Sequence, residues 1–190
     1  MIYNLQSASK LASYKLLSNT VVPRPIAWVS SVSKQGVVNL APFSFFAPIC
    51  SSPVIFSLAL TMKSSGEKKD TLKNIEDTKL ASISLPSFKN AKLMELSGTE
   101  LEYDKSEASE FGIELFSPLA AFPPIAKSVD VAYFCELEDI LSFSPGNFSV
   151  FLRAKEAYIR DELYSDSLKF ELDSIGRVGK GFTDCILKNI

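Results

Sequence analysis

Histidine is absent from this chain of 190 residues. Without an imidazole, the chain cannot form a Ser-His-Asp or Cys-His hydrolase site, and it cannot bind zinc or haem through histidine. Acid–base chemistry would therefore fall to carboxylate, Lys, Tyr or Cys side chains or to a cofactor. A chain of this length buries about 70% of its unfolded surface, so it needs no metal or disulfide to hold its fold. We predict no metal site.

Cysteine is scarce, and the three cysteines, Cys50, Cys135 and Cys185, lie far apart in the sequence. This spacing matches no zinc or thioredoxin motif. The odd number, together with a polar first segment (residues 1–15) that lacks the apolar centre of a signal peptide, is typical of a protein in the reducing cytoplasm. We therefore predict a cytoplasmic protein whose cysteines are buried apolar residues.

Neither sign of charge is in clear excess, since 20 Lys and Arg residues stand against 22 Asp and Glu residues. Proteins that bind nucleic acid usually carry a basic excess or a basic stripe, so we expect no nucleic-acid partner. Charge is missing altogether between residues 35 and 62, a stretch long enough to cross a membrane. Pro42, Pro48 and Pro53 interrupt it, and its β-branched and aromatic content is typical of strands. We predict two buried strands joined by a proline-rich connection, and no membrane partner.

Hydrophobic periodicity predicts a mainly-β fold with inserted helices. The expected strands span residues 26–32, 37–40, 54–60, 80–85, 129–137 and 148–159, and the first two form a hairpin. Three helices are expected. The first starts at Asp70 or Thr71, and the other two span residues 90–96 and 106–111. In the first of these helices Leu72 and Ile75 should face inward, whereas Asn74 should face the solvent. Strands do not alternate strictly with helices, so a barrel fits better than a doubly wound sheet, and the length predicts one domain over residues 1–190.

Glycine-rich nucleotide-binding motifs are also missing. The nearest match to a dinucleotide fingerprint, residues 176–181, stands at the wrong end of the chain with no helix after it, and no phosphate loop of the Walker type occurs. Paired carboxylates, such as Glu100 with Glu102 and Glu136 with Glu138, are interpreted as parts of a solvated surface. No side chain is assigned as a catalytic residue.

One segment suited to ligand binding spans residues 39–46. Here a strand should end in a proline-containing turn whose backbone amides, with the Ser44 hydroxyl, can hydrogen-bond the edge of a planar heterocycle. The aromatic rings of this segment and Trp28 can cover the face of that heterocycle. The alternative is a corner of the hydrophobic core, in which the proline only limits the strand.

A second such segment, residues 68–75, places two lysines and a threonine at the start of a helix. Orphan amides and the helix dipole favour an anion there, which suits a phosphate. The alternative is that Asp70 or Thr71 caps the helix and the lysines are solvated. Arg24 stands between two prolines that would present its guanidinium to a phosphate at fixed geometry, the alternative being an ordinary surface salt bridge.

The order of these motifs resembles the flavin reductase-like family, the FMN-binding split-barrel group that includes flavoredoxin-like proteins. The resemblance is close over about residues 21–86. The segments that carry it are residues 24–32, Gly36, residues 39–46, Pro53 and residues 69–75, with weaker matches at Pro123-Pro124, at Cys135-Glu136-Leu137 and at Gly176-Arg177. One such motif is a weak signal, but the ordered set at this spacing is a strong one.

The resemblance implies a split β-barrel, with a barrel core at about residues 21–160 and a C-terminal extension at residues 161–190. It also implies a homodimer with FMN near the subunit interface, in agreement with the apolar cluster of Phe43, Phe45 and Phe46. The residues expected at the isoalloxazine ring are Asn39, Ala41, Pro42, Phe43, Ser44 and Phe45, with Ser30 and Ser31 on the adjoining strand. The residues expected at the phosphate are Lys69 and Thr71, assisted by Arg24, with Lys63 and Ser65 in the preceding loop. Arg177 matches an arginine of the family's C-terminal turn that can reach the site.

The implied activity is transfer of hydride from a reduced nicotinamide, NADH or NADPH, to bound FMN, and onward to free flavin, a partner oxygenase or another acceptor. Such chemistry needs placement and electrostatics from the protein rather than a histidine. The alternatives are an FMN-binding electron-transfer module without nicotinamide oxidase activity, and a split barrel that acts on a small molecule without flavin. The chain departs from the family pattern at residues 151–155 and 179–182, and these departures leave the electron donor open.

Overall fold

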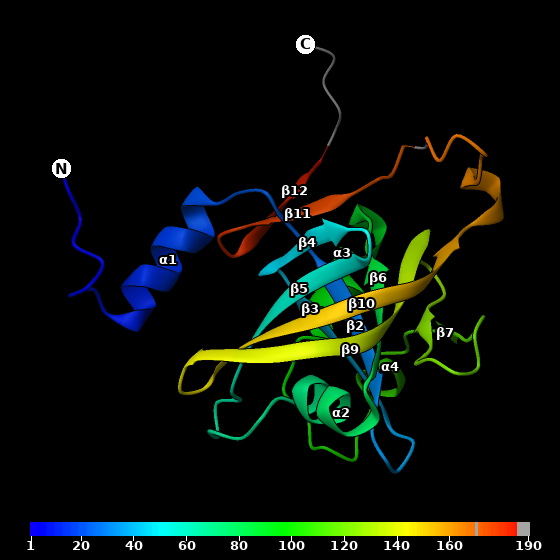
Figure 1. Cartoon of the computed structure of the whole chain (residues 1–190), viewed down its shortest axis with the longest axis horizontal. Coiled ribbons are helices and arrows are strands. Elements are labelled where there is room, and N and C mark those ends of the chain that lie inside the picture. The colour runs from blue at the N-terminus through cyan, green and yellow to red at the C-terminus, as the bar shows by residue number, and fades with distance from the viewer. Residues whose placement is uncertain (170, 186–190) are drawn as a thin grey trace.

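A seven-stranded antiparallel sheet forms the body of the protein in the computed structural model, which describes residues 1–169 and 171–185 (Figure 1). The strand order is β3-β2-β6-β9-β10-β5-β4. The strands are β2 (Ala27–Val32), β3 (Val38–Phe43), β4 (Phe46–Ser51), β5 (Val54–Thr61), β6 (Leu80–Leu85), β9 (Val131–Ser144) and β10 (Asn147–Ile159). β2 and β3 pair as the predicted hairpin, so the mainly-β prediction with inserted helices is confirmed.

Two small sheets and the helices surround this body. The small sheets are β1 (Arg24–Pro25) with β11 (Ile175–Val178) and β12 (Gly181–Asp184), and β7 (Leu115–Phe116) with β8 (Ile125–Ala126). The helices are α1 (Lys10–Thr20), α2 (Asp70–Thr78), α3 (Ala91–Leu96) and α4 (Glu107–Glu110), with short 3-10 turns η1 (Phe88–Asn90) and η2 (Asp161–Leu163). The predicted helices thus form, whereas α1 and the short strands were not predicted.

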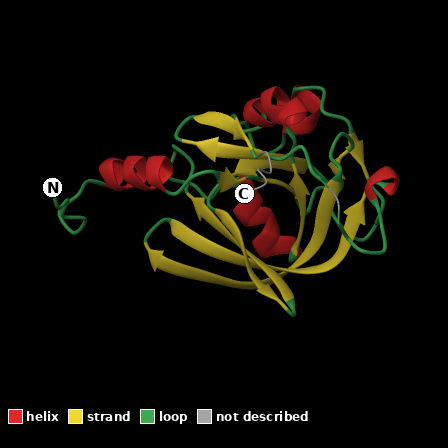
Figure 2. Cartoon of the chain, turned by 90° about the horizontal axis from the view of Figure 1, so that it is seen from above, coloured by secondary structure: helices red, strands yellow, loops and turns green. Residues whose placement is uncertain are grey.

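The large sheet curves around α2, which lies within the curve of the strands (Figure 2). On this side, Leu72 and Ile75 of α2 are fully buried in one core cluster with strand residues such as Leu58 and Val150. On the other side of the sheet, Trp28 packs in a second cluster with residues of α3, α4 and the segment that follows them. The sheet therefore separates two cores, and α2 is held by the first of them.

The charge-free stretch folds differently from its prediction. Residues 35–62 contain three strands, β3, β4 and β5, instead of two strands and a connection. Pro42 and Pro48 lie inside β3 and β4, where they pair with Trp28 and Phe56. A proline removes a ladder donor, which is tolerated at the edge of a sheet, and β3 and β4 are the two edge strands. The expectation that a turn begins at Pro42 is therefore wrong.

Other side chains also depart from expectation. Asn74 is buried instead of solvent-facing: its Nδ2 donates to Ser31 Oγ at 3.2 Å, and its Oδ1 accepts from the Tyr103 hydroxyl at 2.9 Å. Cys135 is buried as predicted, and burial raises the pKa of its thiol to about 12. Cys50 is half-buried and Cys185 is exposed, so the prediction of buried cysteines holds for Cys135 alone.

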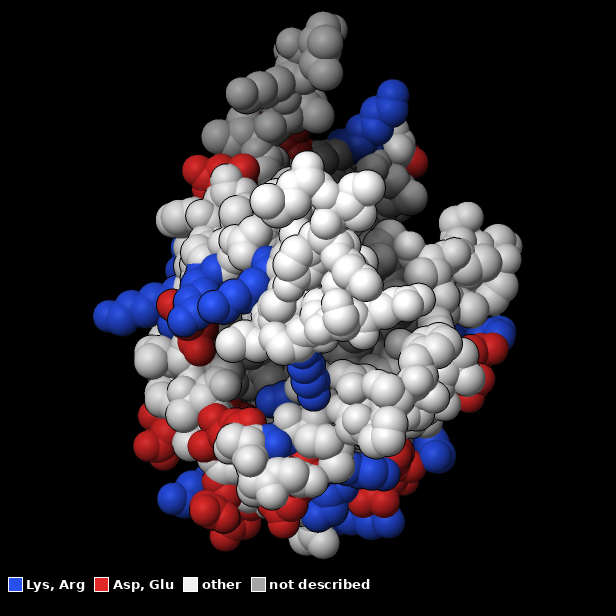
Figure 3. Space-filling view, turned by 90° about the vertical axis from the view of Figure 1, so that its left-hand side faces the viewer, with Lys and Arg blue, Asp and Glu red and all other residues white. Residues whose placement is uncertain are grey.

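α1 projects from the body together with the N-terminal residues (Figures 1 and 2). Ser9 caps the helix by accepting the backbone N–H of Ala12 at 3.2 Å, and Ser18 is the buried residue of the helix. Viewed from the side of α1, acidic and basic side chains are interspersed around an uncharged centre (Figure 3). Among the described residues, the helices are too short or too polar to span a membrane. One domain over residues 1–190 stays a prediction.

Candidate functional site

A pocket of about 60 Å³ lies where α2 begins, and we call it the helix-start pocket. Its walls come from β3, the loop between β5 and α2, residues 97–101 and α4. The predicted residues that it brings together are Asn39, Ala41, Pro42, Phe43, Lys63, Lys69 and Thr71. Because α2 is anchored in the core by Leu72 and Ile75, its first turn is held against the edge strand β3.

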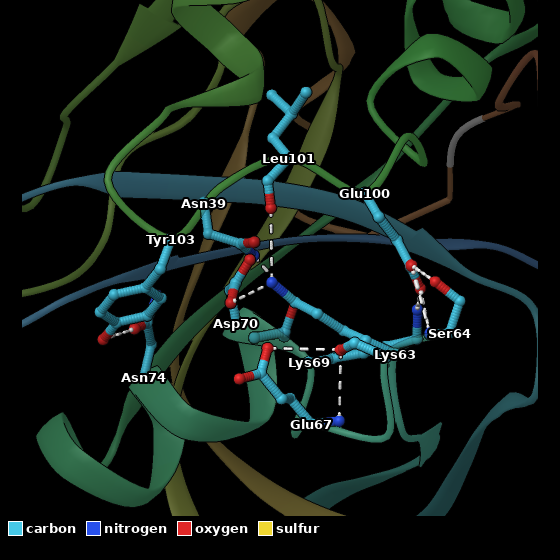
Figure 4. Close-up of polar contacts among 12 residues, drawn as sticks. Asn39, Lys63, Ser64, Glu67, Lys69, Asp70, Asn74, Glu100, Leu101 and Tyr103 are labelled. Carbon is cyan, nitrogen blue, oxygen red and sulfur yellow. Dashed lines mark hydrogen bonds and ion pairs between the residues drawn. The ribbon is translucent and has the colours of Figure 1, made fainter.

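Buried hydrogen bonds join β3 to α2 at the back of this pocket. Asn39 Nδ2 donates to Thr71 Oγ1 at 2.8 Å and lies 3.4 Å from Ser31 Oγ. Ser31 in turn accepts from Asn74. Asn74 also accepts a hydrogen bond from the Tyr103 hydroxyl (Figure 4). Thr71 and Asn39 are thereby fixed in place, since buried polar groups that hydrogen-bond one another favour one arrangement.

Both lysines of the pocket face a carboxylate. Lys63 Nζ lies 2.8 Å from Asp70 Oδ1, and each of these side chains is 12% exposed. Lys69 Nζ lies 3.5 Å from Glu100 Oε1 in a more open position, with the two side chains 28% and 37% exposed. Lys63 also donates to the carbonyl of Leu101, which ties residues 97–101 to the loop before α2 (Figure 4).

Glu100 of the pocket also contacts Ser64, an exposed residue of the loop before α2 that lies beside the pocket lining. The Ser64 N–H lies 3.2 Å from both carboxylate oxygens, and the Ser64 hydroxyl donates to Oε2 at 2.5 Å. The hydrogen bond from the Ser64 hydroxyl is the main cause that lowers the pKa of Glu100, and burial opposes it. Glu100 is exposed, as its interpretation as part of a solvated surface predicts, but its contacts with Ser64 and Lys69 were not predicted.

Glu107 forms a buried wall of the same pocket. Its side chain accepts the backbone N–H of Leu40 at 2.9 Å, and the residue is only 4% exposed. Burial raises the pKa of Glu107, and the hydrogen bond from Leu40 opposes that change. The carboxyl group therefore connects α4 to the edge strand β3 on which the candidate ligand-binding residues lie.

A second pocket, which we call the outer pocket, adjoins the first and shares Pro42, Phe43 and Gly98 with it. It measures about 290 Å³, near the lower end of the range of about 300–1,000 Å³ typical of small-molecule sites, whereas the helix-start pocket is smaller than that range. Tyr14 of α1 and Phe182 of β12 contribute aromatic walls, and the predicted residues Ser44 and Arg177 line it too. The Arg177 guanidinium lies 4.3 Å from the centre of the Phe182 ring and contacts Glu95 at 3.4 Å.

Five predicted residues lie outside both pockets. Arg24 is buried, and its guanidinium donates to the carbonyls of Ser18 and Gly179 and to Ser44 Oγ, so it links chain segments instead of facing the lysines. It is not a surface salt-bridge arginine either. The others are occupied as follows: Ser30 donates to the Pro124 carbonyl, Ser31 holds Asn39, Phe45 stacks on Tyr14, and Ser65 donates to Glu67.

Several pocket residues escaped prediction because they come from distant segments. Asp70 was considered only as a helix cap, and Glu107 sits in a short helix whose burial is not evident from its sequence. Tyr14 lies on a helix that has no clear apolar stripe, since most of its side chains are exposed. The Ser97-Gly98-Thr99 turn was the one available signal, because small residues often mark a close approach of the backbone to another group.

Comparisons with known proteins agree on one family. The family profile described as "Flavin reductase like domain" matches residues 18–170. A relative from Aquifex aeolicus, itself described as uncharacterized, is 30% identical over 183 residues, which are 92% of this chain and 93% of the relative.

Three solved structures share the fold of this chain. One, from Shewanella frigidimarina and described as having a split barrel domain, matches with a TM-score of 0.85 and 14% identity, over 100% of this chain and 98% of that one. Nitrilotriacetate monooxygenase component B from Bacillus cereus matches with a TM-score of 0.89 and 23% identity, over 100% of this chain and 98% of that one. The 2-nitrobenzoate 2-nitroreductase NbaA of Pseudomonas fluorescens matches with a TM-score of 0.88 and 27% identity, over 100% of this chain and 94% of that one. The predicted split barrel is therefore confirmed.

The buried carboxyl of Glu107 gives a pH-dependent prediction. A carboxyl whose pKa is raised on folding retains its proton in the folded chain where the unfolded chain has lost it, so its burial costs stability as the pH rises. Glu107→Gln keeps an oxygen that can accept from Leu40 but removes the charge. We expect its thermal midpoint to exceed that of the unmodified protein by a few degrees at pH 8, and by less at pH 5. Glu110→Gln, an exposed change in the same helix, serves as the control, and an equal shift of the Glu107 variant at both pH values would contradict the assignment.

Proposed function

Because the chain belongs to the flavin reductase-like family, we propose that it is an FMN-containing oxidoreductase that takes hydride from a reduced nicotinamide. NADH and NADPH are the candidate donors. Free flavin, a partner oxygenase or another small molecule would receive the electrons. One observation carries the proposal. The helix-start pocket, which holds anion-binding groups at the start of α2, adjoins the outer pocket, which is lined by aromatic rings.

The helix-start pocket fits the phosphate end of FMN. Ser64 and Lys69 already hold a carboxylate, which shows that their donors converge on one anion. Thr71 lies in the first turn of α2, where the backbone amides and the helix dipole favour negative charge. We assign the binding of the phosphate to Lys69, Thr71 and Ser64, with Lys63 held back by its ion pair with Asp70.

The edge strand β3 fits the ring end. Ala41, Pro42 and Phe43 pass from the helix-start pocket to the outer pocket, so a ligand can extend along them from one pocket to the other. An edge strand keeps backbone groups that no neighbouring strand pairs, and these can bond the polar edge of a planar ring. Phe43 supplies apolar surface for its face, and Ser44 adds a hydroxyl at the far end.

The chemistry that bound FMN would supply is the acceptance of a hydride and the transfer of its two electrons to an acceptor. The side chains of the protein would bind and orient the flavin and the substrate. Tyr14, Phe182 and Arg177 line the outer pocket, where rings and a guanidinium suit a planar substrate that carries negative charge. No protein acid or base is assigned to the reaction.

The names of the similar structures suggest acceptors. A monooxygenase component supports a partner oxygenase as the acceptor of electrons, and a nitroreductase supports direct reduction of a small aromatic molecule. A homodimer is part of the proposal, because α1 exposes Leu11, Tyr14 and Leu17 where a second subunit could cover them. The cytoplasmic location and the absence of a nucleic-acid partner stay predictions from the sequence.

The absorption spectrum of the purified protein tests the function. We expect a flavin spectrum, either at once or after addition of FMN, and rapid loss of the flavin absorbance when NADH or NADPH is mixed in without oxygen. A colourless protein that does not take up added FMN would contradict the proposal. Loss of absorbance only in the presence of a partner protein would instead favour the electron-transfer module.

Two adjacent lysines provide a matched test of the phosphate assignment. Lys69→Ala removes a pocket cation, whereas Lys68→Ala removes a cation that lies outside both pockets and pairs with Glu76. A hydrogen bond to a charged group contributes about 1.5–3 kcal/mol, so we expect the Kd for FMN to rise about tenfold or more in the Lys69 variant. The Lys68 variant should bind FMN as the unmodified protein does. Equal affinities in the two variants would refute the role of Lys69.

A further inference from the structure

The anion-binding groups at the edge of the helix-start pocket, Lys69 and the neighbouring Ser64, already hold an anion that belongs to the chain. Glu100 lies between α3 and α4, outside any helix or strand. Its carboxylate receives the N–H and the hydroxyl of Ser64 and lies 3.5 Å from Lys69 Nζ. An N–H, an O–H and an ammonium group are also the donors that proteins use for phosphate, so the carboxylate takes the place of phosphate oxygens.

The loop that supplies these donors is held by its own backbone hydrogen bonds. Gly66, at φ +86°, lets the loop turn, and its N–H donates to the Lys63 carbonyl at 3.0 Å. The Lys63 N–H donates to the Glu67 carbonyl at 2.8 Å and closes the loop. The position held by the Glu100 carboxylate is therefore set by the fold of the loop, not by Glu100 itself.

The charges of the pocket place Glu100 in competition with a phosphate. Two lysines, Lys63 and Lys69, stand against three acids, Asp70, Glu100 and Glu107. A phosphate carries a charge of about −1.5 to −2 near neutral pH, so it would meet like charge at close range while Glu100 stays in place. Asp70 is tied to Lys63 and Glu107 is buried, whereas Glu100 is 37% exposed on an irregular segment. Glu100 is thus the acid that can leave.

We propose that Glu100 determines the affinity for flavin phosphate, because its carboxylate occupies the anion position and must leave Ser64 and Lys69 before the phosphate binds there. The inference rests on the proposed function and deepens it. Riboflavin has the same ring as FMN but no phosphate. Glu100 therefore lowers the affinity for FMN and leaves the affinity for riboflavin unchanged. A flavin held against such a competitor exchanges more readily than one that enters an empty anion site.

Titrations with FMN and with riboflavin separate this role from a general effect on the pocket. Glu100→Gln keeps the shape of the side chain and removes its charge, and Glu100→Ala removes the whole group. Glu102→Gln is the matched control, because Glu102 is an exposed acid two residues away that does not line either pocket. Quenching of flavin fluorescence gives the Kd, and thermal unfolding verifies that each variant is folded.

We expect both Glu100 variants to bind FMN about tenfold more tightly than the unmodified protein, with riboflavin changed by less than about twofold. The Glu102 variant should change neither value. Folded Glu100 variants whose FMN affinity is unchanged or weaker, or whose affinity for both flavins rises alike, would overturn the role of Glu100 while leaving flavin binding intact. Failure of every protein to bind either flavin would overturn the proposed function and this inference with it.

Discussion

The burial of one face of α2 within the curve of the large sheet is the constraint on which the site depends. Leu72 and Ile75 are fully buried in the core that the concave side of the sheet provides. They fix both the position and the rotation of the helix, so its first turn, with Lys69 and Thr71, meets the edge strand β3. The polar contact of Asn39 with Thr71 then sets the register between helix and strand at that point.

The arrangement of the sheet explains why β3 serves as the ligand-binding strand. As an edge strand, β3 tolerates Pro42 and retains backbone groups that no second neighbour pairs. The segments that complete the pockets come from far along the chain: Glu107 bonds β3 directly, residues 97–101 lie over Lys63, and the C-terminal hairpin brings Arg177 and Phe182 to the outer end. The large sheet and α2 thus position one side of the site, and α4, residues 97–101 and the C-terminal hairpin complete it.

What the sequence predicts well is what local patterns and neighbouring residues decide. The β2–β3 hairpin, α2 and its inward residues follow from periodicity, and the motif at residues 69–75 places Lys69 and Thr71 in the pocket. Contacts between distant segments are not encoded locally, which is why Arg24 was expected at a phosphate but links Ser18 to Gly179. For the same reason the contacts of the exposed Glu100 carboxylate with Ser64 and Lys69 could not be predicted. The positions of Pro42 and Pro48 within strands were not predicted. A strand tolerates proline when it lies at the edge of a sheet, and the order of strands in the sheet is not evident from the sequence.

A crystal structure of the protein grown with FMN tests the central claim most directly, namely that the donors at the start of α2 hold the flavin phosphate while the ring lies along β3. The account predicts phosphate oxygens at hydrogen-bond distance, about 2.7–3.2 Å, from Lys69 Nζ and Thr71 Oγ1, with the ring against Pro42 and Phe43. It also predicts that the Glu100 carboxylate no longer contacts Ser64. A flavin whose phosphate lies elsewhere, with Glu100 still bonded to Ser64, would contradict it.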